Sequence, residues 1–188
     1  MKRLLTPLVL VMLAAGCSAP AAQPPAQTSE APTSETTPTP VVMAPGKYTF
    51  ENATGATGTL DIPGQPDPEI EKLRELAGAA PTTYLTVHVD NRKGTVGVNM
   101  YAVSIFTPEG KELKYVNADT YIDELRPDDA PAEVYNQFIE LGNKHMEMAK
   151  PKAVKDFVLV GPTVPDVIAG ITVYPTGMSG EVDALPAS

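Results

Sequence analysis

The residues best suited to bind a metal in this 188-residue chain lie in one short stretch, His145-Met146-Glu147-Met148. Imidazole nitrogen and thioether sulfur suit Cu(I), so His145, Met146 and Met148 indicate one hypothesis, an extracytoplasmic metal carrier. The alternative is structural. On that interpretation Met146 packs a helix against a sheet, and His145 lies at the C-terminal end of the helix, where a cation is favoured. A carrier also needs further ligands, and Met100 is expected to face the core.

Carboxylates are crowded into a second stretch, at Asp119, Asp123, Glu124, Asp128 and Asp129. Oxygen clusters can bind Ca²⁺, but the D-x-D-x-D-G spacing of a calcium loop is absent here. Paired carboxylates also hydrolyse glycosides. However, the chain has no Trp and only 6% aromatic residues, while sugar clefts usually need aromatic platforms. We interpret the cluster as a solvated acidic rim.

Nucleophilic catalysis has little support in the sequence. Serine hydrolases of the G-x-S-x-G type need that motif, which the chain lacks. His88 alternates with Val87 and Val89, which places it on the outer face of a strand. We therefore expect a protein that is not an enzyme and that needs no cofactor.

The only cysteine, Cys17, follows a basic start at Lys2-Arg3 and an apolar run from Leu8 to Ala15. Eight residues at about 1.5 Å each are too short to cross a bilayer core of about 30 Å, but they fit a secretory signal. Leu13-Ala14-Ala15-Gly16-Cys17 resembles the lipobox of bacterial lipoproteins, with the leucine one position earlier than usual. The resemblance implies a signal peptide over residues 1–16 and a lipidated Cys17.

These features predict a location at the cell membrane, on the extracytoplasmic face, with the N-terminal lipid (acyl chains such as palmitate) as the membrane partner. The formal net charge is −9, so the chain has no general electrostatic attraction for nucleic acid. With one cysteine there is no internal disulfide, and stability must come from a packed core.

Composition divides the chain after residue 45. Residues 17–45, which include Cys17, are rich in Pro, Thr and Ala and predict a disordered linker with polyproline character. Residues 46–178 read as one folded domain, and residues 179–188 as a flexible tail.

The domain begins with two strand patterns and a short helix. Asp67 is a plausible N-cap before Pro68, and Ile70, Leu73 and either Leu76 or Ala77 recur on one face. Alternating strands and turns follow. In the strand after the turn at 91–94, alternation puts six residues on one face: Val96, Val98, Met100, Ala102, Ser104 and Phe106.

Residues 119–150 break this β pattern and predict a helical insertion. Val134, Phe138, Leu141 and His145 form one stripe, and Tyr135, Ile139 and Met146 lie beside it. Two strand patterns, near 153–162 and 169–177, complete the sheet. The order predicts a mainly-β fold, an immunoglobulin-like antiparallel β-sandwich with a short helix and a helical insertion.

The turns carry a second resemblance. Asp90-Asn91, Pro108-Glu109-Gly110-Lys111 and Tyr174-Pro175 stand where turns and a last hairpin occur in small immunoglobulin-like domains. The chain is similar in this to bacterial cell-surface lipoproteins of actinobacterial type, whose function is unknown. Their family offers no catalytic residues to carry over.

The leading hypothesis is a lipid-anchored binding or interaction module without catalytic activity, which meets a protein or peptide partner in the cell envelope. Its contact surface is expected on the insertion, at Tyr121, Asp123, Tyr135 and Phe138. An open alternative is that Tyr135 and Phe138 are core residues. The metal carrier using His145, Met146 and Met148 and a purely structural spacer of the cell envelope are the competing functions.

Overall fold

The computed structural model of the chain describes residues 42–175 and 180–188. The predicted signal peptide, Cys17 and the linker as far as residue 41 lie outside these ranges. So do residues 176–179, where the last predicted strand ends.

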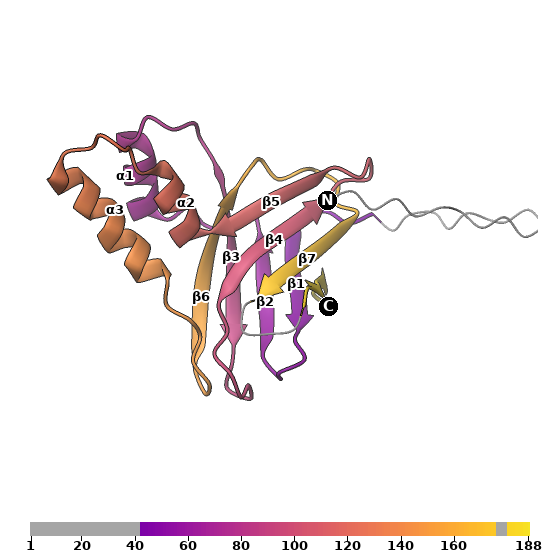
Figure 1. Cartoon of the computed structure of the whole chain (residues 1–188). Helices are drawn as coiled ribbons and strands as arrows, with labels where there is room; N and C mark the ends of the chain where they lie inside the picture. The colour runs from indigo at the N-terminus through magenta and orange to yellow at the C-terminus, as the bar shows by residue number, and fades with distance from the viewer. Residues whose placement is uncertain (1–41, 176–179) are drawn as a thin grey trace, which may run out of the picture. The chain divides into compact units, whose positions relative to one another are not determined.

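Within these described ranges, nine strands pair antiparallel in one nearly closed sheet (Figure 1). The strands are β1 (Gly46–Glu51), β2 (Thr57–Ile62), β3 (Thr83–Asp90), β4 (Met100–Phe106), β5 (Glu112–Asn117), β6 (Val154–Gly161), β7 (Gly170–Pro175), β8 (Val182–Asp183) and β9 (Leu185–Pro186). Their order across the sheet is β8-β7-β4-β5-β6-β3-β2-β1-β9. Three helices join them: α1 (Pro68–Leu76), α2 (Ala118–Leu125) and α3 (Ala132–His145).

The prediction of a mainly-β, antiparallel fold is confirmed, with its short helix at α1 and its helical insertion at α2 and α3. Hydrogen bonding connects all nine strands into one sheet. That pairing does not by itself establish the immunoglobulin-like sandwich, in which two sheets are separate.

The main core lies inside the sheet and follows the alternation of the strands. In β1 and β2 the buried side chains are Tyr48, Phe50, Leu60 and Ile62, while Thr49 and Glu51 between them are exposed. The next strand continues the pattern, since Leu85, Val87 and Val89 are buried and His88 is exposed. Alternation in sequence therefore predicts this half of the core well.

The predicted core face of β4 is only half correct. Val98 and Met100 join the main core, but beyond them Val103 and Ile105 do so instead of Ala102 and Ser104. The pairing of β4 with β7 shifts register between Met100 and Ala102, as a β-bulge does. One extra residue turns every later side chain to the opposite face, so the simple alternation fails beyond Tyr101.

The C-terminal residues belong to the sheet, which corrects the prediction of a flexible tail over 179–188. Val182 and Asp183 pair with β7, and Leu185 and Pro186 pair with β1. Between them Ala184 is 3% exposed and contributes to the main core. We call residues 182–186 the seam strand, because it joins the two edges of the sheet.

The three helices lie beside the point where β5 and β6 stop pairing. These two strands share only the pairs Val116↔Val160 and Asn117↔Leu159, and α2 begins directly after Asn117. In Figure 1 the three helices lie together on one side of the sheet, beside β6. A second hydrophobic cluster joins them to the strands: Ile70, Leu73, Tyr84, Ala118, Ile122, Phe138, Leu141 and Val160.

Candidate functional site

Helix α1 is fixed at its start by its N-cap. The Asp67 carboxylate accepts hydrogen bonds from the backbone N–H groups of Glu69 and Ile70, at 2.9 and 3.2 Å, and Pro68 occupies the first turn. Both features match the prediction. Of the alternatives for its apolar face, Leu76 is 51% exposed, so Ala77 is the residue that packs on the helix cluster.

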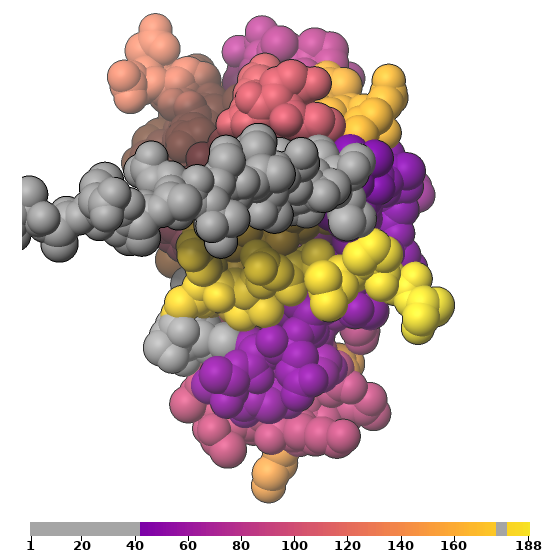
Figure 2. Space-filling model, turned by 90° about the vertical axis from the view of Figure 1, so that its right-hand side faces the viewer, coloured from indigo at the N-terminus to yellow at the C-terminus, as the bar shows by residue number. Residues whose placement is uncertain are grey.

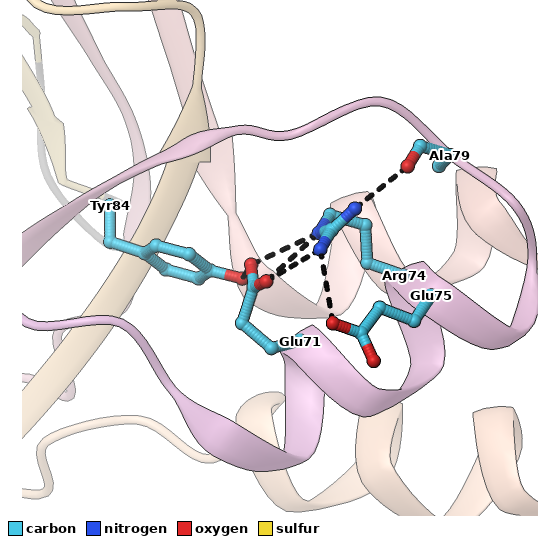
Figure 3. A network of polar contacts seen from close by, with 5 residues as sticks. All are labelled: Glu71, Arg74, Glu75, Ala79 and Tyr84. Carbon is cyan, nitrogen blue, oxygen red and sulfur yellow. Dashed lines mark hydrogen bonds and ion pairs between the residues drawn. The ribbon is translucent and has the colours of Figure 1, made fainter.

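A polar network holds the middle of α1 against β3 (Figure 3). The Tyr84 hydroxyl donates a hydrogen bond to Glu71 Oε1 at 2.6 Å. Arg74 donates from Nη2 to Glu71 Oε2 at 2.8 Å, and from Nη1 to the Ala79 carbonyl at 2.8 Å. The Arg74 side chain is only 11% exposed. Its charge is therefore matched inside the fold rather than by water.

The same network shifts the acidity of its members. The hydrogen bond from Arg74 is the main reason that the pKa of Glu71 lies below its ordinary value. Burial, followed by the bond to Glu71, raises the pKa of the Tyr84 hydroxyl. At neutral pH the network is a carboxylate held by a phenol and a guanidinium, an arrangement that fixes the position of a helix.

Helix α2 is fixed to the sheet by Asn117, which is 3% exposed. Its Nδ2 donates to the Met100 carbonyl at 2.5 Å, and its Oδ1 accepts from the Asp119 N–H at 3.4 Å. One side chain thus caps the helix and ties its start to β4. The same face of α2 buries Ile122 against α3.

The four predicted binding residues have different environments. Phe138 is 1% exposed and lies in the helix cluster, so its predicted contact role is wrong and the core interpretation holds. Tyr121 packs partly against the same cluster, and burial raises its pKa. Asp123 and Tyr135 are exposed, the latter by 39%.

Asp123 and Tyr135 are linked by a residue that the sequence analysis did not select, Arg126. Its Nη1 lies 2.7 Å from Asp123 Oδ1, and its guanidinium lies 4.9 Å from the centre of the Tyr135 ring. The i,i+3 spacing of Asp123 and Arg126 was a readable signal for this pair. The contact of Arg126 with the Tyr135 ring could not be predicted from the sequence, because α2 and α3 meet only in the folded chain.

An open groove of about 330 Å³ lies between α2 and α3. One wall carries Asp119, Asp123 and Arg126, and the other carries Asn143 and Met146. The groove thus offers both charges, an amide and a thioether, on a floor that includes Phe138 and Ile122. Such a combination can hold a peptide or a protein side chain.

The proposed metal ligands are directed to different elements. His145 is half-buried, its Nε2 lies 3.8 Å from Asp67 Oδ2 on α1, and burial lowers its pKa. Met146 is 58% exposed, which contradicts the prediction that it packs the helix on the sheet. Met148 covers Gly97, where an added Cβ would lie 2.3 Å from the sulfur.

No group of three or more His, Cys, Asp or Glu side chains within residues 42–175 and 180–188 could hold a metal ion. His88 is exposed, as predicted, and its Nδ1 lies 2.5 Å from Asp156 Oδ1 on the neighbouring strand. Within the same ranges, no helix is both long and apolar enough to span a bilayer.

Comparison of the chain with protein-family models, with curated proteins and with solved structures finds no match.

The Glu71 network predicts a pH-dependent contribution to stability. We expect Glu71→Gln to lower the free energy of unfolding by about 1–2 kcal/mol at pH 7, because Arg74 then lacks its charged acceptor. Since the folded pKa of Glu71 is below 4.5, this contribution is present above that pH and is lost as the pH falls through the folded value. Urea unfolding at pH 7 and at pH 3.5 measures the difference between the two proteins.

Glu75 provides the matched control, since its carboxylate is 3.6 Å from Arg74 but 72% exposed. We expect Glu75→Gln to cost less than about 0.5 kcal/mol. Equal losses in the two variants, or a Glu71→Gln effect that is unchanged at pH 3.5, would contradict the role given to the network.

A pair of aromatic truncations separates core from surface on α3. Phe138→Ala should cost about 3–5 kcal/mol, because it leaves a cavity in the helix cluster. Tyr135→Ala should cost less than about 1 kcal/mol, because the ring is exposed. Urea midpoints at constant m-value report both. A Tyr135→Ala loss as large as that of Phe138→Ala would show that Tyr135 is a core residue.

Proposed function

We propose that the protein is a lipid-anchored, extracytoplasmic interaction module without catalytic activity, and that the α2–α3 groove contacts a protein or peptide partner. The observation that carries the proposal is the exposure of α3. In a helix of 14 residues, only Phe138 and Leu141 are buried. Most of its surface, with the adjoining groove, is therefore available to a partner.

The groove is held in place by the fold, which favours binding. Asn117 fixes the start of α2, and the Glu71–Arg74–Tyr84 network fixes α1, whose apolar face belongs to the helix cluster. A surface that is preorganised loses less conformational entropy when a partner binds. The exposed Met146 beside the groove adds a polarizable, adaptable apolar group, and Tyr135 adds an aromatic one.

The anchor part of the proposal rests on the sequence alone, and it has its own test. We expect the mature protein from a bacterial host to begin at Cys17 and to carry the mass of a diacylglyceryl group and one further acyl chain. Intact mass spectrometry of detergent-extracted protein measures this, and Cys17→Ser should abolish both the mass increase and the membrane association. An unmodified Cys17 in membrane-extracted protein would refute the anchor.

The groove can be tested in the cells that produce the protein. A photo-crosslinking amino acid in place of Tyr135 should give a discrete adduct with a partner, because the Tyr135 ring is exposed and contacts Arg126, which lines the groove. The matched control is Tyr101, an equally aromatic residue of β4 that is 60% exposed on the sheet. The Tyr135 adduct should also disappear when Arg126→Glu reverses the charge in the groove.

Two outcomes would count against the groove. One is the absence of any adduct at Tyr135 in an envelope where the protein is correctly localised. The other is an adduct of the same size at both Tyr135 and Tyr101, since that pattern reports mere proximity on the membrane.

A further inference from the structure

The sheet closes through a short strand that has two residue pairs on each side. The seam strand pairs with β7 only at Thr172↔Asp183 and Val173↔Val182, and with β1 only at Tyr48↔Pro186 and Thr49↔Leu185. By contrast β3 and β6 are in register from Thr83↔Gly161 to Asp90↔Val154. Ladder hydrogen bonds are therefore few at the seam.

The directions of the strands mean that closing the sheet needs one further strand between β7 and β1. The seven longer strands alternate in direction from β7 to β1, since each neighbouring pair is antiparallel. An odd number of alternating strands leaves β7 and β1 parallel to each other. Only a strand antiparallel to both can complete the pattern, and an edge without one presents unpaired N–H and C=O groups.

Few side chains of the seam strand contact the rest of the sheet. Ala184 is buried and its N–H donates to the Ile171 carbonyl at 3.0 Å, whereas Asp183, Leu185 and Pro186 are exposed, Leu185 by 66%. Figure 2 shows the C-terminal residues, in yellow, at the surface beside the indigo residues of the N-terminal end of the sheet. Val182 packs partly against the main core as well. The site thus selects an extended backbone with a small side chain at its centre and a β-branched one two residues before it.

Two open hollows flank the seam strand, and Asp183 and Leu185 line both. One, of about 730 Å³, is mainly apolar and includes Met43, Phe106 and Ile171. The other, of about 630 Å³, lies over β1, β2 and β3. The seam strand therefore lies between two hollows that it does not fill, and the one over β1, β2 and β3 is the more polar.

The hollow over β1, β2 and β3 is acidic. Its lining contains the carboxylates of Glu51, Asp90 and Asp183, one imidazole, His88, and no Lys or Arg. Arg92 balances Asp90, with Nη2 at 2.5 Å from Oδ2. In the part of the chain that the structure describes, Glu51 and Asp183 have no ion-pair partner. The native strand thus adds a carboxylate to an acidic lining, and a basic residue at this position would be attracted to that lining.

We infer that the seam between β7 and β1 is a second binding site, which takes an extended, basic peptide strand from a partner protein in place of residues 182–186. The preferred segment has a small residue in the position of Ala184 and a Lys or Arg in the position of Asp183. Binding is by strand addition to two edges at once. This site is separate from the α2–α3 groove, so the failure of either leaves the other standing.

Affinity is limited by the tethered native strand. A free peptide must compete with a segment whose effective concentration is of the order of millimolar. The nine-residue peptide of residues 180–188 should therefore bind with an apparent Kd of about that size. The same peptide with Asp183→Lys should bind roughly threefold tighter or better, because it exchanges a charge repulsion for an attraction.

Titration of the ¹⁵N-labelled full chain, with Cys17→Ser to remove the native thiol, tests this by NMR. We expect saturable shifts of the Ala184 and Ile171 amide resonances with both peptides. A third peptide, with Asp183→Lys and Ala184→Trp, should produce none, because the indole does not fit the core position.

A disulfide lock gives the decisive control. Thr172 and Asp183 face each other across the strand pair, with Oγ1 and Oδ1 3.4 Å apart, so Thr172→Cys with Asp183→Cys places two thiols in position to bond. The oxidised protein should not respond to peptide, and reduction of the same sample should restore the response.

Three results would overturn the proposal: no response of the reduced protein, an equal response of the oxidised protein, or no preference for the basic peptide. A concentration-dependent dimer in sedimentation that blocks the peptide would also overturn it. In that case the occupant is the seam strand of a second copy rather than a partner's peptide.

Discussion

Strand parity is the constraint on which this structure depends. Seven long strands alternate in direction around the sheet, and a closed antiparallel sheet needs an even number. The C-terminal residues complete the count, although they do so with two short strands around one buried alanine. Because the core lies inside the sheet, every buried side chain of β1 and β7 depends on that closure to exclude water. A five-residue segment near the end of the chain therefore protects a core that is built from the other strands.

Where the helices attach, the sheet is open rather than closed by a further strand. There β5 and β6 separate after two residue pairs, and the chain fills the opening with a second apolar cluster rather than with more strands. Polar groups fix two of the three helices that cover that end: Asp67 and Asn117 cap the starts of α1 and α2, and Glu71 and Arg74 tie α1 to Tyr84 of β3. Helix α3 has no side-chain cap and is held by its apolar contacts in the helix cluster. Each of these polar groups is satisfied within the fold, so a displaced helix would leave buried polar atoms without partners. The position of the groove beside α3 follows from this anchoring.

The sequence predicted local structure better than it predicted contacts. Alternation located the strands, and the Asp67-Pro68 start located α1, because these signals depend on neighbours in the chain. The β4 bulge and the pairing of residues 182–186 were missed, since both depend on partners far away in sequence. For the same reason Phe138 and Tyr135 could not be distinguished: they lie three residues apart on one helix, and only the packing of α1 and α2 decides which is buried.

The two proposed sites would bind their partners in different ways. A partner in the α2–α3 groove meets a surface already formed, so its affinity is not reduced by an opening equilibrium. A strand at the seam must first displace a native segment, and its apparent affinity falls by the fraction of chains that are open. Opening at the seam breaks two ladder pairs on each side, fewer in all than the β3–β6 ladder contains, and it uncovers the small side chain of Ala184 and part of Val182. A chain held on a membrane surface would meet partners at high local concentration, and under that condition a weak, displaceable strand can still be exchanged.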